Sequence, residues 1–128
     1  MQVPDNPREI TVSRYDPGFL YRLPGREWQL LLGPQTGESH RMTMSIATFP
    51  PGSAPPLHVH ADEEEMVYVL TGRGRLVNEL DDVQLEPGVA FRVPVGVRHG
   101  AVNDGDEPLR LLCVFDPPVV PGSYEAAR

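Results

Sequence analysis

The chain has 128 residues, a length that favours a single domain, and 40% of them are hydrophobic and 23% charged. Its formal net charge is −7. Positive residues occur in sparse pairs such as Arg73 and Arg75. This distribution lacks the basic surface that nucleic acids or anionic membranes require, so neither is an expected partner.

The single cysteine, Cys113, excludes an intrachain disulfide and agrees with a reducing compartment. The first ten residues hold two prolines and no apolar stretch, and no apolar run approaches the roughly 20 residues of a membrane span. We therefore expect a cytoplasmic protein. We expect Cys113 itself to be a small buried hydrophobic residue rather than a nucleophile, because interior cysteines pack well and react little.

Residues 1–25 are irregular and are predicted to form either an N-terminal arm in dimer contact or a loose tail. Short strand-like runs then follow one another, separated by turns rich in proline and glycine. They are 27–32, 41–49, 57–60, 65–72, 75–80, 83–86, 89–93, 98–103 and 109–115. These runs place a β-barrel at 26–116 and a C-terminal tail at 117–128.

Several runs alternate between two faces, as strands do. Phe91 lies on one face with Val89 and Val93. Met42 and Met44 share a face in another run, and we expect this pair to fill gaps in the core. No helical periodicity survives the 15 prolines. The pattern predicts an all-β sandwich or barrel with few or no helices.

Three of the four histidines and one glutamate form the chemically most informative group: His58, His60, Glu65 and His99. Histidines two positions apart on a strand point the same way, with Cα atoms about 6.5–7 Å apart. Two such imidazoles can converge on one ion with bonds of about 2.1 Å. Isolated His-x-His pairs are also found exposed on strands, and His40, outside this group, is expected at the surface.

Two longer patterns contain these residues. One runs from Gly52 to Gly72 and the other from Gly88 to Asn103, and they carry His58, His60, Glu65, Pro94, Gly96 and His99 at fixed spacings. In this spacing the chain resembles the cupin superfamily, and it is similar to the smallest single-domain members. Pro94 and Gly96 are expected to form a turn before His99, and Asn103 to brace a neighbouring loop.

The resemblance implies an antiparallel double-stranded β-helix, also called a jelly roll. It implies a mononuclear metal site with His58, His60, Glu65 and His99 as ligands of one divalent ion. Fe, Mn, Ni, Co, Zn and Cu are all compatible with this ligand set. It also implies a small-molecule substrate or ligand and a homodimer. Glu64 is the alternative carboxylate, because adjacent strand residues face opposite ways and only one can face the site.

Three functions remain open at this level. The first is a metal-dependent dioxygenase, because ions that accept five or six ligands keep positions open for O₂ and substrate. The second is a redox-neutral isomerase, cyclase or lyase that uses the ion as a Lewis acid. The third is a non-catalytic module that binds a small molecule or metal. Members of one fold perform all such tasks, so the fold does not choose among them.

The substrate pocket is predicted from alternation alone. Phe91 and Phe115 are expected to line it, and Tyr68 to line its mouth or to pack in the core. Arg41 would pair with a substrate carboxylate if its strand presents it inward, and otherwise would face solvent. The sequence shows no nucleophile–base pair and no phosphate-binding loop, so any catalysis is expected to be metal-centred.

Overall fold

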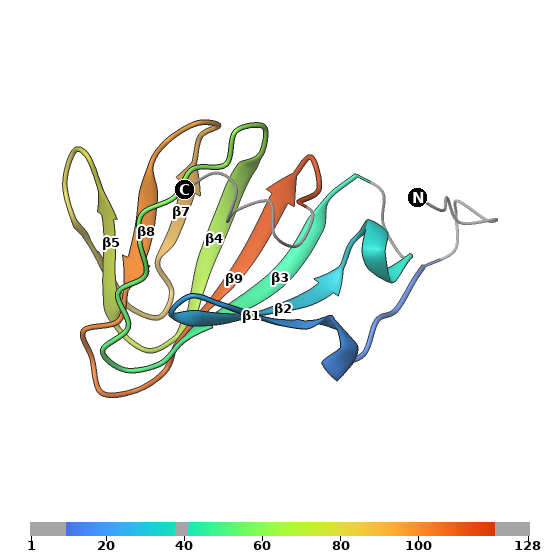
Figure 1. The fold of residues 1–128 in the computed structure, drawn as a ribbon, viewed down its shortest axis with the longest axis horizontal. Helices are drawn as coiled ribbons and strands as arrows, with labels where there is room; N and C mark the ends of the chain where they lie inside the picture. The colour runs from blue at the N-terminus through green and yellow to red at the C-terminus, as the bar shows by residue number, and fades with distance from the viewer. Residues whose placement is uncertain (1–9, 38–40, 120–128) are drawn as a thin grey trace.

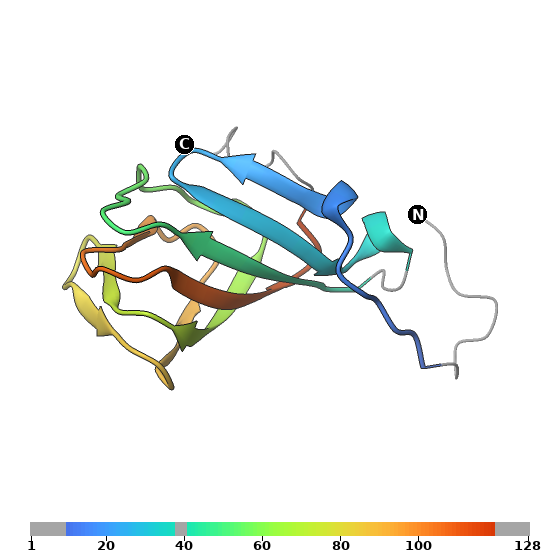
Figure 2. The ribbon, with the colours of Figure 1, turned by 90° about the horizontal axis from the view of Figure 1, so that it is seen from below.

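The computed structural model describes residues 10–37 and 41–119, and these residues form two antiparallel sheets (Figures 1 and 2). The strands are β1 (Leu20–Leu23), β2 (Arg26–Leu32), β3 (Thr43–Phe49), β4 (Glu64–Thr71), β5 (Gly74–Asn78), β6 (Val83–Leu85), β7 (Ala90–Val93), β8 (His99–Val102) and β9 (Leu109–Asp116). Two short 3₁₀-helices, η1 (Pro17–Phe19) and η2 (Pro34–Thr36), flank β1 and β2. The described residues contain no α-helix.

The larger sheet has the order β1-β2-β3-β9-β4-β7, and the smaller sheet has the order β6-β5-β8. Every strand pair is antiparallel. A single bridge between His58 and His99 joins the segment before β4 to the small sheet. Figure 2 shows the two sheets curving around a shared interior. The predicted all-β double-stranded β-helix is confirmed.

The core lies between the sheets and is built by strict alternation along β3, β4 and β9. Alternate residues of these strands point into the interior, and we call that side the inner face. On β9 the inner residues run from Leu109 to Phe115 and are at most 4% exposed. Burying large apolar side chains such as these contributes roughly 1.5–3 kcal/mol each, so this face contributes substantially to stability.

The expectation that Met42 and Met44 lie in the core is wrong. The inner face of β3 instead carries Thr43, Ser45 and further small or aromatic residues, while Met42 is 48% exposed. The two hydroxyls tolerate burial because each is hydrogen-bonded: Thr43 Oγ1 accepts from the Val119 amide at 3.1 Å, and Ser45 Oγ donates to the Cys113 carbonyl at 3.5 Å.

Two local predictions also differ from the structure. The sequence pattern predicted no strand at 20–23, yet these residues form β1 and pair with β2 from Leu20↔Gln29 to Leu23↔Arg26. The strand expected at 57–60 is an irregular segment, and its ladder contact is the His58–His99 bridge. Alternation within a strand therefore does not explain how His58 and His60 come to face the same interior.

Backbone conformation explains two of the glycines in the motifs. Gly72 has a φ of 87°, and a Cβ there would lie 2.4 Å from the Pro108 carbonyl oxygen, so a side chain would clash with backbone. Gly96 has a φ of 79° in a turn closed by a bond from the Val97 amide to the Pro94 carbonyl. The predicted Pro94–Gly96 turn before His99 is confirmed.

The boundaries 1–25, 26–116 and 117–128 remain a prediction, because residues 1–9 and 120–128 lie outside the described residues, as does His40. Among the residues that are described, no helix is long and apolar enough to cross a membrane.

Candidate metal centre

The two histidines of the first motif enter the interior from the segment that precedes β4. His58 exchanges two backbone hydrogen bonds of 2.9 Å with His99, which begins β8. The His60 carbonyl accepts a 2.9 Å bond from the Gly96 amide in the turn before His99. These bonds fix the backbones of the two motifs against each other. The backbone bonds hold the three imidazoles together, although the segment that carries His58 and His60 is not a regular strand.

Glu65 comes from β4 and points to the inner face, where it is 6% exposed. Its neighbour Glu64 points the opposite way and forms a 2.8 Å ion pair with Arg92 at the surface. Strand alternation thus places Glu65, and not Glu64, beside the histidines. Its Oε1 lies 3.6 Å from His60 Nε2 and 3.3 Å from His99 Nε2.

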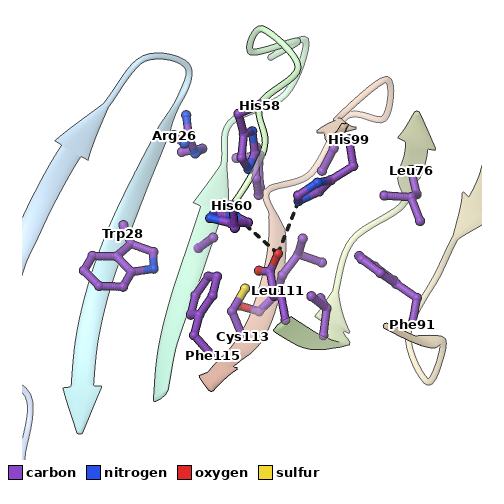
Figure 3. Close-up of a pocket in the computed structure, with 15 residues that line it drawn as sticks. Arg26, Trp28, His58, His60, Leu76, Phe91, His99, Leu111, Cys113 and Phe115 are labelled. Carbon is purple, nitrogen blue, oxygen red and sulfur yellow. Dashed lines mark hydrogen bonds and ion pairs between the residues drawn. The ribbon is translucent and has the colours of Figure 1, made fainter. Parts of the chain in front are cut away.

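The three imidazoles point toward one another across the cavity (Figure 3). Their candidate ligand nitrogens all lie within 4.8 Å of one another. Bonds of about 2.1 Å to a shared ion require donor atoms roughly 3–4 Å apart, so small side-chain rotations suffice. Imidazole nitrogens with one carboxylate oxygen are a donor set that divalent transition metals accept. The residues present therefore fit a single metal ion.

The protonation of the histidines also favours metal binding. Burial, with smaller contributions from His99, His60 and Arg26, lowers the pKa of His58 to about 2. Burial lowers the pKa of His60 to about 4, although Glu65 opposes the shift. Both rings are therefore neutral at pH 7, as metal ligands must be. His99 Nδ1 lies 2.9 Å from the Val97 carbonyl, and a proton donated there leaves Nε2 as an acceptor facing Glu65.

The cavity around these residues is small and mostly apolar. It measures about 40 Å³. Its wall contains Trp28, Phe91 and Phe115 together with several aliphatic side chains. The structure places Arg41 and Tyr68 elsewhere: both are exposed and neither lines the cavity.

The cation in the cavity wall is Arg26, a residue that the sequence motifs did not indicate. It begins β2 on the inner side and is 7% exposed. It lies outside both motifs. The available signal was its position two residues before Trp28 in an alternating run, which assigns the two side chains to one face.

Cys113 lies in the cavity wall and is 4% exposed. Burial is the main reason that its pKa is raised well above the usual value, and the nearby Glu65 carboxylate adds to the shift. The side chain is therefore a neutral thiol at pH 7. This agrees with the expectation of a small buried hydrophobic residue rather than a nucleophile.

Asn103 has the bracing role that the sequence predicted. It is fully buried, and its Nδ2 donates to the Phe49 carbonyl at 2.9 Å and to the Glu107 carbonyl at 2.7 Å. Its Oδ1 accepts from the Gly105 amide. These bonds tie the end of β3 to the loop between β8 and β9, so the residue supports the fold near the centre without facing the histidines.

Comparison with known proteins agrees with this geometry. A family model described as a cupin domain matches residues 45–115, which include all four candidate ligands. An uncharacterized protein of Methanocaldococcus jannaschii is 32% identical over 88 residues, covering 69% of this chain and 70% of that protein. The polyketide synthase CurC of Streptomyces cyaneus is 30% identical over 111 residues, covering 87% and 70% respectively.

Among solved structures, a predicted oxalate decarboxylase of Thermotoga maritima superimposes with a TM-score of 0.71. It is 25% identical to this chain, and the alignment covers 84% of this chain and 99% of that one. The names of CurC and of the predicted decarboxylase indicate different activities, so the shared architecture does not by itself assign a reaction.

Proposed function

This chain belongs to the cupin family, and from that premise we propose that it is a mononuclear metal-dependent enzyme acting on a small molecule. The observation that carries the proposal is the convergence of three imidazoles and Glu65 in a small, largely apolar cavity. His58, His60, Glu65 and His99 would hold one divalent ion, with Fe, Mn, Ni, Co, Zn or Cu as candidates.

Our first candidate reaction is that of a dioxygenase. When bound, a redox-active ion would supply O₂ activation, and a redox-silent ion would supply Lewis acidity. Four protein ligands leave room on a five- or six-coordinate ion. The chain's own contribution is to keep His58 and His60 neutral and to surround the ion with the apolar side chains of Phe91, Phe115 and Trp28.

A redox-neutral reaction is the alternative: isomerisation, cyclisation or lyase chemistry. Similarity to the predicted oxalate decarboxylase of T. maritima favours it, because loss of CO₂ from a carboxylic acid is lyase chemistry. A non-catalytic small-molecule or metal-binding module is the third possibility. The same donor set serves all three, so the identity of the ion and the demand for O₂ must distinguish them.

The test begins with protein purified without oxygen. Elemental analysis identifies its metal. O₂ consumption is then measured after small organic acids are added as candidate substrates. Iron with substrate-dependent O₂ consumption would support the dioxygenase. Turnover without O₂ consumption would support the redox-neutral enzyme. Stoichiometric metal and tight ligand binding without turnover would leave the binding module. A His99→Ala variant with full metal occupancy would contradict the proposed ligand set.

We also propose a homodimer in the cytoplasm with a small molecule as its partner. The proposal of a dimer is motivated by the sheet edges that an isolated barrel leaves open. Gel filtration measures it directly, since the monomer has a mass of 14.2 kDa. Elution at the monomer mass would contradict the dimer and would leave the metal site unaffected.

A further inference from the structure

The outer face of the large sheet carries a group of apolar side chains that the core does not use. β4, β9 and β3 lie side by side in this sheet (Figure 1), and their inner residues belong to the core. On the outer face Met66 is 58% exposed and Tyr68 is 45% exposed. We call six residues of this face the outer patch: Met44, Ile46, Met66, Tyr68, Leu112 and Val114.

The strand register makes the outer patch continuous. Val114 of β9 lies between Met44 of β3 and Met66 of β4. The next row has Leu112 in the same central place, with Tyr68 beside it. Directly opposed residues have Cβ atoms about 4.5–5.5 Å apart, so these side chains form one surface and not isolated spots. A contiguous exposed apolar surface with a charged rim is typical of a protein–protein contact.

The two ends of the outer patch carry opposite charges, and both charges belong to β9. Arg110 is exposed at one end of this strand, and Asp116 is exposed at the other. Asp116 lies opposite Glu64, which Arg92 already pairs. In the part of the chain that the structure describes, neither Arg110 nor Asp116 forms an ion pair. Two carboxylates opposite each other destabilise a sheet, so a further cation would stabilise the acidic end.

A two-fold axis allows one copy of the chain to supply that cation to another. If the axis lies between two facing patches and perpendicular to the strands, each strand runs antiparallel over its own copy. Arg110 then lies opposite Asp116 of the partner subunit, and Asp116 lies opposite the partner's Arg110. The apolar rows meet in the same way, with Leu112 against the partner's Val114. The face is therefore complementary to itself in both charge and apolar character.

The dimensions of the face agree with this arrangement. Arg110 and Asp116 are six positions apart on β9, a distance of about 20 Å. Sheets that pack face to face cross at about 30°, which moves the strand ends sideways by roughly 5 Å, a distance that an arginine side chain spans. From β2 to β7 the sheet is about 19 Å wide. Two such faces with their protruding side chains bury on the order of 1,000 Å² together, about the minimum for a specific interface.

The net charge of the chain also favours this face. At a net charge of −7, two copies of the chain repel each other on average. The charges around the outer patch are balanced, since Arg92 and Arg110 offset Glu64 and Asp116. Contact through this face therefore avoids the net repulsion between two acidic surfaces.

We propose that the outer patch is the interface with a second copy of this chain, in which Arg110 of each subunit pairs with Asp116 of the other. The inference rests on the proposed homodimer and names the surface that forms it, and it does not depend on the metal ion. A different protein would need its own matching cation and carboxylate, whereas this chain carries both at the required spacing on one strand. An outer patch that served only the stability of the single chain would not link Arg110 to Asp116.

The experiment measures the dissociation constant of the dimer by sedimentation of the full chain over a wide range of protein concentration. The variants are Arg110→Asp, Asp116→Arg and the double variant that carries both changes. The matched control is Arg73→Asp, which changes the net charge as Arg110→Asp does. Arg73 pairs with Glu86 at the surface and lies outside the outer patch. Circular dichroism and elemental analysis report the fold and the metal content of each protein.

We expect each single reversal to weaken the dimer by about 10- to 100-fold, because it places like charges opposite each other at both ends of the interface. The double variant restores the attraction with the signs exchanged, so its dissociation constant returns to within about threefold of the wild type. Arg73→Asp dimerises as the wild type does. Met66→Ala removes apolar contact and is expected to weaken the dimer by about 10-fold.

Three results would overturn the proposal: a wild type that stays monomeric at every concentration, single reversals that dimerise as the wild type does, or a folded double variant as weak as the single ones. If Arg110→Asp does not fold, Asp116→Arg decides, because it reverses the other half of the same pair. A dimer that ignores all these changes forms elsewhere, which would overturn this surface and leave the homodimer. A wild type that takes up no metal but responds to the charge reversals as expected would overturn the proposed metal-dependent function and support this interface.

Discussion

The inner and outer faces of β3, β9 and β4 differ in a way that hydrophobicity alone does not predict. The inner face carries Thr43, Ser45 and Glu65 at 6% exposure or less. The outer face carries Met66 and Tyr68 at 58% and 45% exposure. Polar groups lie inside where they have hydrogen-bond partners or serve the candidate site. Apolar groups outside cost little when they are scattered.

This contrast teaches that a buried polar side chain carries more information about function than a buried leucine does. Every inner polar group of these three strands has a defined neighbour: Thr43 bonds the Val119 amide, Ser45 bonds the Cys113 carbonyl, and Glu65 meets two histidines. Burying a polar group costs free energy of folding unless the group has a hydrogen-bond or ionic partner, so these positions are less favourable for stability than apolar ones.

The sharpest test of the two faces uses adjacent glutamates. Glu65→Gln removes the inner carboxylate and is expected to weaken metal binding by at least the roughly 10- to 100-fold seen when supporting residues of metal sites are changed. Glu64→Gln removes an outer carboxylate that pairs with Arg92, and is expected to leave metal affinity unchanged. Metal titration of both variants measures the difference. Equal losses would show that the two positions do not differ in this way.

Neighbouring leucines on β9 test the same contrast in stability. Leu111 is 3% exposed on the inner face, and Leu111→Ala is expected to cost about 2–5 kcal/mol of unfolding free energy. Leu112 lies half-buried on the outer face, and Leu112→Ala is expected to cost less, about 1 kcal/mol. Urea unfolding at fixed metal content gives both values. A larger loss for Leu112 would imply that another surface covers the outer face.

Two threonines of β3 test the polar side of the contrast. Thr43→Val keeps the shape but leaves the buried Val119 amide without its acceptor, at an expected cost of about 1–3 kcal/mol. Thr48→Val changes a half-buried residue on the outer face of β3 and is expected to lower the free energy of unfolding by under about 0.5 kcal/mol. Thermal unfolding of the two variants compares them directly. Unchanged stability in Thr43→Val would mean that water replaces the lost acceptor.

The smallest expected effect concerns pH in the metal-free protein. The folded-state pKa of His60 is about 4, below the unfolded value of about 6.5. Between pH 6 and pH 5 the unfolded chain therefore binds a proton at this residue that the folded chain does not. Stability present above pH 6.5 is lost as the pH falls, at about 1 kcal/mol per pH unit for His60. His60→Gln should show a shallower decline in urea unfolding than the wild type, and an identical slope would contradict the lowered pKa.

The fold and much of the site were predictable from local rules. Alternation on β4 predicted that only one of Glu64 and Glu65 faces the interior, and the structure places Glu65 there. Turn chemistry predicted the bend at Pro94 and Gly96, because only a residue tolerant of positive φ fits that position. These features depend on residues close together in the chain, and their physics is therefore visible in the sequence.

Other features were wrong or missed because they depend on contacts between distant segments. The Met42 stripe looked like core by residue type, but β9 pairs with β3 so that Thr43 and Ser45 face inward. β1 escaped detection because a four-residue strand gains its stability from pairing with β2. Arg26 lay outside every motif, and its position in the cavity wall near His58 depends on how β2 packs in the folded sheet.

The sequence by itself determined the kind of protein: short alternating strands, and histidines and carboxylates of the types that bind a divalent ion. Only the tertiary structure decided which side of each strand is interior and that Arg26 lies in the cavity wall. The physical reason is that side-chain type and spacing are local properties. Burial and electrostatic environment arise from strands that are distant in the chain and meet only on folding.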